Sequence, residues 1–493
     1  MEQPLYSKSE RINLMKNIKI NLFSLLILAS MGSCTDEILD TIPYAQSTSS
    51  QFWRNVEDAV AAANAMYEPL TNEDFYGHAE HTFDIPSDDQ FRAGDHGEDQ
   101  AIESFTFDAG NPQLFYSWRH KYEVISRANA VLINVPGIAM DQAIKDRTLG
   151  EAHFLRGFAY WRFAVIYGGV PLILEADVLT NNYNKPRAST DEIFAQIEFD
   201  LLQAAQLLPV SHGEADLGRP HRGSANGLLA KMYLYRDNFT KVIEFGNKVL
   251  LGPYPLAANY SANFRVETQN NPEVLFAIQS LEGWQDNTHI IYTTPRPWGG
   301  WDFHEPIDNL IEEFEEGDPR LDYTVYRSGD VVDLGGSGGP TEYTSDLSST
   351  GYHFKKYSSW NARGGLNMSH NNPIIRTADV YLLVAEAKIR AGQNGDMEIN
   401  KVRVRSGRPA LANATIQDLI HERRVELAGE NQRHQDLMRW DKAGIVDIVK
   451  LYMKDLGPLK PPRTFQRPKH YLFAIPQREI DLSNSVLTQN PGY

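Results

Sequence analysis

Cysteine is nearly absent from this sequence, in which Cys34 is the only one. A single cysteine excludes an intrachain disulfide framework and a zinc site built from several thiolates. The number of cysteines alone does not exclude a catalytic thiol. The position of Cys34 argues against that role, because the residue lies near the amino end, directly after an apolar run.

Basic side chains and long apolar runs are also scarce. The sequence has 47 Lys and Arg against 64 Asp and Glu, for a formal net charge of −17. Nucleic acids and anionic membranes are bound by clustered Lys and Arg, so no nucleic-acid partner is expected. No uninterrupted apolar run reaches the roughly 18 residues of a membrane-spanning helix, and none is predicted.

Sequence motifs typical of enzymes are missing as well. The chain contains no G-x-S-x-G elbow, no phosphate-binding P-loop and no G-x-G-x-x-G after a predicted strand. The stretch HERRV at 421–425 lacks the second histidine of a zinc protease. No catalytic residue is therefore predicted. A glycoside hydrolase stays open in principle because it needs only two carboxylates, although no pair stands out among the 64 acids.

The acidic stretch SDDQFRAGDHGED at 87–99 is the one segment whose composition suits calcium. Its spacing fits no EF-hand loop, so a solvated loop is the preferred interpretation. His78 and His81 lie three residues apart without an obvious third ligand. No metal site and no cofactor are predicted, and a structural calcium remains an unsupported alternative.

The amino end has the layout of a secretory signal. Lys16 and Lys19 precede an apolar run over about 22–31, and Gly32 and Ser33 stand directly before Cys34. This order resembles the lipobox of bacterial lipoproteins, in which the cysteine takes a diacylglycerol. We predict a signal peptide at 1–33, lipid attachment at Cys34 and a polar tether at 34–50. Met15 is an alternative start of the signal peptide. A simple signal peptide with an incidental cysteine is the alternative.

Helical periodicity dominates three parts of the remaining chain. Apolar stripes run through 56–70 and 152–166, and a third helix begins at a capping box of Ser189 and Glu192. The segments 223–256 and 378–407 each indicate two helices joined by a short turn. Helix pairs of about 34 residues are typical of tetratricopeptide-like units. An irregular helical domain is the alternative. The stretch from His421 to Trp440 is predicted as one helix with ion pairs at i, i+3 and i, i+4, and an anion clamp is the alternative.

Between these helices the composition changes. Residues 71–118 and 253–375 are rich in Gly, Pro, Asn and aromatics and show few helical stripes. The sequence therefore predicts a mainly α fold with a helical scaffold at about 51–70, 119–252 and 376–440. An irregular lobe of loops and short strands, at about 71–118 and 253–375, would be mounted on it. Loops on a rigid scaffold commonly carry binding residues.

Five blocks, in order along the chain, resemble the SusD/RagB family. They are HFLRGFAYWRFAVIYGGVPLI at 153–173, GRPHRGSANGLLAKMYLY at 218–235, IIRTADVYLLVAEA at 374–387, ERRVELAGENQRHQDLMRW at 422–440 and FAIPQREIDLSNSVLTQNPGY at 473–493. The resemblance spans essentially all of the chain after Cys34. It implies a single SusD-like domain at 51–493, an α-α superhelix of tetratricopeptide-like helix pairs with an irregular second lobe.

The resemblance also implies a role. Members of this family are non-enzymatic outer-membrane lipoproteins of the Bacteroidetes that face the cell exterior. Each covers a SusC-like TonB-dependent transporter and delivers a nutrient to it, usually an oligosaccharide. Asp36 and Glu37, next to the lipid-bearing Cys34, resemble the acidic surface-export signal of such lipoproteins. The partners expected from the resemblance are thus the transporter, the glycan and the outer membrane.

The irregular lobe contains the candidate glycan-binding residues. A sugar site needs flat aromatic faces and a few polar groups in a cleft, and the segment 283–306 is dense in both. Gly299 and Gly300 would let adjacent aromatics face one side. The predicted site residues are Trp284, Tyr292, Trp298 and Trp301 as the stacking platform, with Asp286, Arg296, Trp360, Asp89, Arg92 and Asp95 as further candidates. Two alternatives stay open: a peptide-binding lid of the RagB type, and an enzyme such as a glycoside hydrolase.

Overall fold

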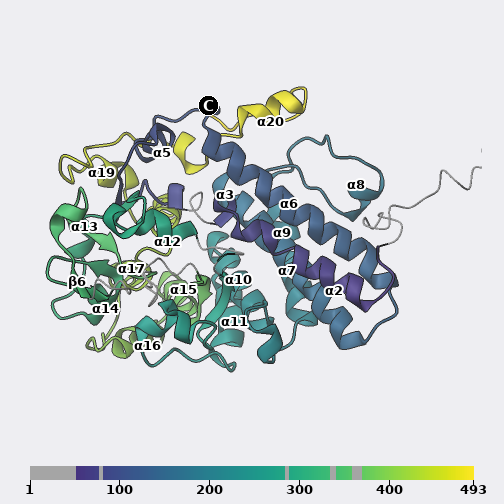
Figure 1. The fold of residues 1–493 in the computed structure, drawn as a ribbon, viewed down its shortest axis with the longest axis horizontal. Coiled ribbons are helices and arrows are strands. Elements are labelled where there is room, and N and C mark those ends of the chain that lie inside the picture. Colours follow the sequence, from purple (N-terminus) through teal and green to yellow (C-terminus); the bar gives the residue numbers. More distant parts are fainter. Residues whose placement is uncertain (1–51, 77–80, 282, 284–287, 334–339, 358–368) are drawn as a thin grey trace, which may run out of the picture. The chain divides into compact units, whose positions relative to one another are not determined.

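The computed structural model describes residues 52–493 except 77–80, 282, 284–287, 334–339 and 358–368 (Figure 1). Residues Asn55–Tyr493 form one compact unit. The signal segment, the tether with Cys34, and the candidates Trp284, Asp286 and Trp360 lie outside the described residues. Within the described part, no helix is both long and apolar enough to cross a membrane.

The scaffold is a series of packed helices. Its members are α2 (Val56–Ala65), α6 (Pro112–Asn134), α7 (Gln142–Ile166), α9 (Thr190–Leu207), α10 (Arg222–Tyr235), α11 (Phe239–Leu250), α15 (Thr377–Arg390), α16 (Asp396–Arg405) and α17 (Ile416–Leu427). Within this set, α6 packs on α7, α7 on α9, α9 on α10 and α10 on α11, and α11 packs on α15 across a long excursion of the chain. Figure 1 shows this series as adjacent helices from α2 to α17. The predicted mainly α fold of stacked helix pairs is confirmed.

Local sequence explains where these helices begin. Asn111 caps α6 with Pro112 in its first turn, and Asp141 caps α7. The predicted capping box of Ser189 and Glu192 is present at the start of α9. The two predicted helix pairs, α10 with α11 and α15 with α16, also have the expected turns. Where α7 crosses α9, Gly157 lies against Leu201, and an added Cβ would approach that side chain to 3.2 Å.

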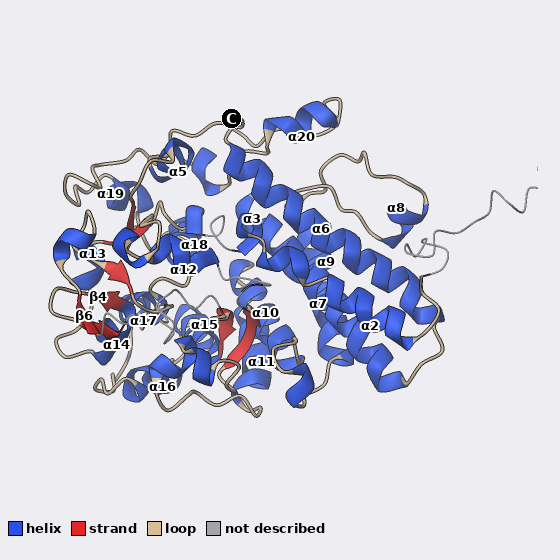
Figure 2. Cartoon of the chain, in the orientation of Figure 1, coloured by secondary structure: helices blue, strands red, loops and turns tan. Residues whose placement is uncertain are grey.

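The second lobe contains short elements and little sheet, as Figure 2 shows. Four antiparallel two-stranded ribbons pair β1 (Gln90–Arg92) with β3 (His304–Pro306), β2 (Val274–Ile278) with β8 (Asn372–Arg376), β4 (Val325–Tyr326) with β7 (His353–Phe354), and β5 (Val331–Asp333) with β6 (Pro340–Glu342). Short helices lie in both parts of the molecule, and one of them, α8 (Glu175–Leu179), packs on α6 of the scaffold. The others are α3 (Glu73–Tyr76), α5 (Gly97–Glu103), α12 (Thr288–Thr293), α13 (Asp308–Ile311), α14 (Pro319–Thr324), α18 (Arg433–Lys442), α19 (Ile448–Tyr452) and α20 (Gln477–Leu482).

Two boundaries differ from the sequence prediction. Helix α6 begins at Pro112, inside the stretch assigned to the irregular lobe, because Asn111 and Pro112 form a helix start there. The single helix predicted from His421 to Trp440 is two helices, α17 and α18. The chain breaks between them because Gly429 and Asn431 adopt left-handed backbone angles, with φ of 74° and 56°.

The arginines and glutamates of α17 join the scaffold to the second lobe. Glu422 and Glu426 are buried and both pair with Arg320 of α14. Glu426 also pairs with Arg376 at the end of β8. These pairs reach other elements rather than the next helical turn. The predicted pairs at i, i+3 and i, i+4 within this segment are represented among the described residues by Asp436 with Arg439, so the prediction of ion pairs holds but most of the partners differ. Removing one partner of a buried pair would leave a charge uncompensated.

Candidate functional site

Trp301 is the exposed aromatic side chain of the predicted platform. It follows the 3-10 turn η7 (Arg296–Trp298) and the glycine pair 299–300, and 43% of its surface is exposed. Gly299 ends the turn with a φ of 91°, and a Cβ on Gly300 would overlap the carbonyl oxygen of Thr294. Both glycines are therefore required by the backbone path. Among the tryptophans that the structure describes, only Trp301 is exposed.

Two buried rings support Trp301 from the interior. Tyr292 of α12 meets it edge to face at 5.1 Å between ring centres, and Phe303 lies 5.7 Å away. The Tyr292 hydroxyl donates a 2.7 Å hydrogen bond to Glu73 of α3. Burial and this carboxylate together raise the pKa of Tyr292 above its usual value. Tyr292 is thus a fixed support for the platform, and its ring is covered rather than offered to a ligand.

Arg92 stands behind Phe303. Its guanidinium carbon lies 3.9 Å from the centre of that ring, and its Nε and Nη2 donate hydrogen bonds of 2.9 and 2.7 Å to Asp99 of α5. A Cβ on Gly94 would come within 2.8 Å of Phe303, so the segment that follows β1 also packs closely on the ring. The order from inside to outside is Asp99, Arg92, Phe303 and Trp301.

Four predicted site residues are buried: Asp89, Arg92, Tyr292 and Trp298. Asp89 and Arg92 do not lie on a solvated loop, because residues 90–92 form β1 and are paired with β3. Asp89 is buried and pairs with Arg424 at 2.6 Å, so its charge is already matched inside the protein. Trp298 is only 9% exposed and packs against Tyr326 and Tyr343. The two glycines thus direct Trp298 and Trp301 into different surroundings rather than toward one face.

Two predicted polar candidates are accessible. Asp95 and Arg296 are exposed, the first beside α5 and the second on the turn that leads to Trp301. His96, which the sequence analysis did not single out, lies 4.9 Å from the Phe303 ring. Among the described candidates, Trp301, Arg296 and Asp95 are exposed to solvent.

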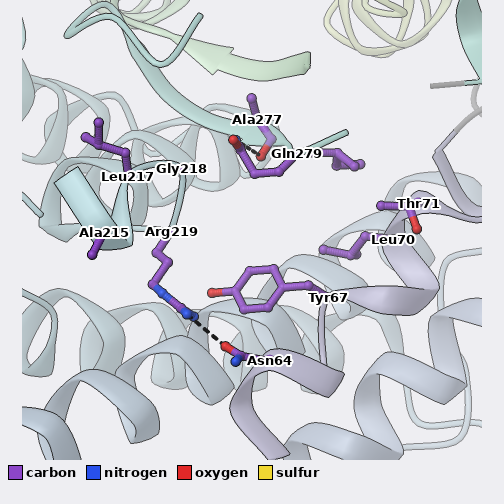
Figure 3. A pocket seen from close by; sticks show the side chains of 11 residues that line it. Asn64, Tyr67, Leu70, Thr71, Ala215, Leu217, Gly218, Arg219, Ala277 and Gln279 are labelled. Carbon is purple, nitrogen blue, oxygen red and sulfur yellow. Dashed lines mark hydrogen bonds between the residues drawn. The ribbon is translucent and has the colours of Figure 1, made fainter. Parts of the chain in front are cut away.

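A polar cavity of about 300 Å³ lies between the end of α2, the segment 215–219 and the end of β2 (Figure 3). Its wall includes Tyr67 and Arg219, which both bind the buried Glu151, at 2.8 and 2.9 Å. Arg219 also donates to Asn64 at 2.7 Å. Thr71 and Gln279 complete its polar lining. Thr71 of its lining lies two residues before Glu73, which accepts the hydrogen bond of Tyr292.

A larger cavity, of about 700 Å³, opens on the scaffold. Its lining is mainly apolar and comes from α6, the segment 171–185 and the carboxyl end of the chain, including Phe115, Trp118, Tyr122, Ile173, Tyr183 and Leu487. Charged side chains such as Arg119, Lys185 and Glu479 also line it. No local motif indicates either cavity, because the linings combine segments that are far apart in the sequence.

A cluster of Asp302, Glu305 and His353 includes the residue directly after Trp301. One ligand atom from each side chain falls within 4.8 Å of the others. His353 Nε2 lies 2.6 Å from Asp302 Oδ1, and the backbone N–H groups of Ser349 and Thr350 donate to Glu305. Burial, reinforced by Asp302, raises the pKa of Glu305 to about 8. No sequence motif indicates this cluster, because His353 comes from β7, which is distant in the chain.

Two family models match the chain. One, described as the SusD family, matches residues 272–493. The other, described as "Starch-binding associating with outer membrane", matches residues 37–234. Together they cover parts of both the scaffold and the second lobe.

Individual proteins with similar sequences cover from 75% to 97% of this chain. SusD-like protein P2 of Formosa agariphila is 26% identical over 530 residues, covering 97% of this chain and 100% of the relative. Starch-binding protein SusD of Bacteroides thetaiotaomicron is 24% identical, covering 75% of this chain and 76% of the relative.

Solved structures have the same fold. A SusD-like protein from Bacteroides fragilis superposes with a TM-score of 0.80 at 24% identity, covering 92% of this chain and all of that one. A laminarin-binding SusD-like protein gives a TM-score of 0.75 at 26% identity, covering 89% of this chain and all of that one. The likeness thus includes the irregular lobe as well as the helical scaffold.

Proposed function

Since this chain belongs to the SusD/RagB family, we propose that it is a non-enzymatic surface lipoprotein that binds an oligosaccharide or polysaccharide. It passes the glycan, as a lid, to a SusC-like TonB-dependent transporter of the outer membrane. The observation that carries the glycan proposal is the exposed Trp301, supported by buried rings in the family's second lobe. Relatives that bind starch and laminarin support the same class of ligand.

The geometry at Trp301 suits the apolar face of a sugar ring. An aromatic face held in one orientation loses little conformational entropy on binding, and stacking removes apolar surface from water. Arg296, on the turn before Trp301, and Asp95 are exposed charged groups that can form hydrogen bonds with sugar hydroxyls. The cavity of Figure 3 offers further polar partners, Asn64, Thr71 and Gln279, to an extended chain. One ring on one tryptophan binds weakly, so affinity arises from several such contacts.

Lipid attachment at Cys34 would hold the protein at the outer face of the outer membrane. A tethered binding protein raises the concentration of its glycan near the transporter, so weak binding suffices for delivery. The family description that mentions outer-membrane association supports this location. The working step is then release of the glycan into the transporter rather than a chemical reaction.

Affinity electrophoresis tests the glycan proposal. The purified protein is run through gels that contain starch, laminarin or other soluble polysaccharides, beside Trp301→Ala and Phe199→Ala. Phe199 is the matched control because it is 50% exposed and lies on α9 of the scaffold. At least one glycan is expected to retard the wild type and Phe199→Ala but not Trp301→Ala. Equal retardation of all three proteins would contradict the proposed site.

The same panel separates the remaining alternatives. Release of reducing ends from any polysaccharide would identify a hydrolase and contradict the non-enzymatic role. Peptide binding has one observation in its favour, the apolar cavity of about 700 Å³, which suits apolar side chains. Titration with mixed peptides in place of glycans tests it, and binding of peptides without binding of any glycan would favour a RagB-type lid.

A further inference from the structure

Glu305 is a buried carboxylate without a basic side chain beside it. Six other glutamates of the described residues are equally buried, and each pairs with Arg or Lys: Glu151 with Arg219, Glu273 with Arg376, Glu386 with Arg439, Glu398 with Lys388, Glu422 with Arg320 and Glu426 with Arg405. A buried charge without an opposite charge is costly. Within the described chain, Glu305 is thus the exception to a consistent rule.

The neighbours of Glu305 add a second negative charge to this buried site. Its side chain contacts that of Asp302, a second carboxylate, and neither residue lies within 4 Å of an Arg or Lys among the described residues. The groups that compensate them are the N–H groups of Ser349 and Thr350 and the imidazole of His353. Two carboxylates in contact need a positive charge between them, supplied by a proton or by a metal ion.

The imidazole of His353 is held as it is in many metal sites. Its Nδ1 lies 2.8 Å from the hydroxyl of Tyr343, and its Nε2 is directed at Asp302. A hydrogen bond at one ring nitrogen fixes the ring and leaves the other nitrogen as a ligand. The side chain of His353 is fully buried, whereas Asp302 is 16% exposed. Asp302 therefore marks the side from which an ion can enter.

We propose that Asp302, Glu305 and His353 bind one divalent cation of the zinc and manganese class. One imidazole nitrogen and two carboxylate oxygens suit these ions, whereas calcium prefers oxygen ligands alone. Metal–ligand distances of about 2.0–2.2 Å place ligand atoms within about 4 Å of one another. The present spread of up to 4.8 Å requires only small side-chain movements. Water molecules complete the coordination on the open side.

Such an ion would connect three segments at the platform. Asp302 directly follows Trp301 and has a left-handed backbone, with φ of 61°. Glu305 lies on β3, which pairs with the strand of Arg92, and His353 lies on β7. The ion would hold the turn of Trp301 against both ribbons. This inference goes beyond the proposed function and does not depend on it, since cation binding is measured without any glycan.

Calorimetric titration of tag-free, EDTA-treated full-length protein tests the proposal, with ZnCl2, MnCl2 and CaCl2 as separate titrants. Zinc or manganese is expected to bind at one site per chain. Glu305→Gln and His353→Gln should weaken that binding at least tenfold. Asp330→Asn is the matched control, because Asp330 pairs with Lys355 outside the cluster and should leave binding unchanged.

Circular dichroism shows whether each variant is folded, and the visible spectrum of bound Co²⁺ gives a second readout on the wild type. A cobalt spectrum that zinc abolishes is expected. Absence of zinc and manganese binding to the wild type at 1 mM, binding of calcium alone, or unchanged binding in folded Glu305→Gln would each overturn the proposal. If both ligand variants unfold, Tyr343→Phe replaces them, and it is expected to weaken binding by about tenfold; unchanged affinity would overturn the assignment.

Discussion

The guanidinium carbon of Arg92 lies 3.9 Å from the centre of the Phe303 ring, while the same side chain binds Asp99. Phe303 in turn packs against Trp301. A buried ion pair therefore sets the position of an exposed aromatic side chain. Residues that solvent never reaches thus determine the geometry of the proposed binding surface.

Replacing Arg92 by Met should destabilise the protein strongly. The change keeps an apolar stem over Phe303 but takes the guanidinium away from the buried Asp99, at an expected cost of about 3–5 kcal/mol in the free energy of unfolding. Urea unfolding measures it. The double variant Arg92→Met/Asp99→Asn should be more stable than Arg92→Met alone, and a double variant that is less stable would contradict the ion-pair explanation.

Truncation of Trp298 should mainly reduce stability, whereas truncation of Trp301 should mainly reduce glycan binding. Trp298→Ala removes a buried ring from the cluster with Tyr326 and Tyr343 and should lower the free energy of unfolding by about 3–5 kcal/mol. Trp301→Ala removes a half-exposed ring and should lower it by about 1 kcal/mol, yet abolish glycan retention. Urea unfolding and affinity electrophoresis on the same samples check both expectations. A large stability loss in Trp301→Ala would assign it to the core instead.

The two adjacent glycines should differ in their tolerance of alanine. Gly299 has a φ of 91° with open space around it, so Gly299→Ala should cost about 1–2 kcal/mol through backbone strain. Gly300→Ala places a methyl group on the Thr294 carbonyl and should displace the turn, lowering both stability and glycan binding further. Thermal melts of the two variants give the comparison. Equal melting temperatures would show that the backbone shifts easily there.

Acid should destabilise the protein partly through His434. Burial, with Arg463 and Lys460 nearby, lowers the pKa of this histidine to about 3. The folded state therefore keeps it neutral, whereas the unfolded chain protonates it near the usual pKa of about 6.5. Its contribution to stability is complete above pH 6.5 and is lost as the pH falls from 6.5 toward 3.

Urea midpoints between pH 7 and 4 measure this effect. They should decline in the wild type and decline less steeply in His434→Phe. The phenylalanine variant is expected to be less stable at pH 7, because Tyr452 loses its hydrogen-bond partner at 2.6 Å. Parallel declines in the two proteins would assign the acid sensitivity to other groups.

Replacing Cys34 by Ala should release the protein from the membrane fraction. Acyl chains contribute about 0.8 kcal/mol for each buried CH2 group, so their loss removes the proposed anchor. Fractionation and labelling with radioactive palmitate in the native host measure it, while binding of glycan by the purified variant should equal that of the wild type. A variant that stays labelled and membrane-bound would contradict lipid attachment at Cys34.

The sequence by itself determined the helical scaffold. Periodic apolar residues and caps such as Ser189 with Glu192 act within one or two turns, so the paired helices α10 with α11 and α15 with α16 could be predicted from local patterns. The resemblance to the SusD/RagB family at 153–173 and 473–493 could also be recognised from the sequence. The prediction of one continuous helix at 421–440 was wrong, because the apolar periodicity does not report the left-handed backbone angles at Gly429 and Asn431.

Only the tertiary structure decided which predicted site residues meet solvent. Trp298 and Trp301 stand in the same aromatic, glycine-rich segment, yet rings from 326 and 343 cover the first and leave the second exposed. Asp89 is neutralised by Arg424, and Glu305 meets His353, through contacts between parts of the chain that are far apart. Helix formation depends on neighbours in the sequence, whereas burial and charge pairing depend on neighbours in space, which no local pattern specifies.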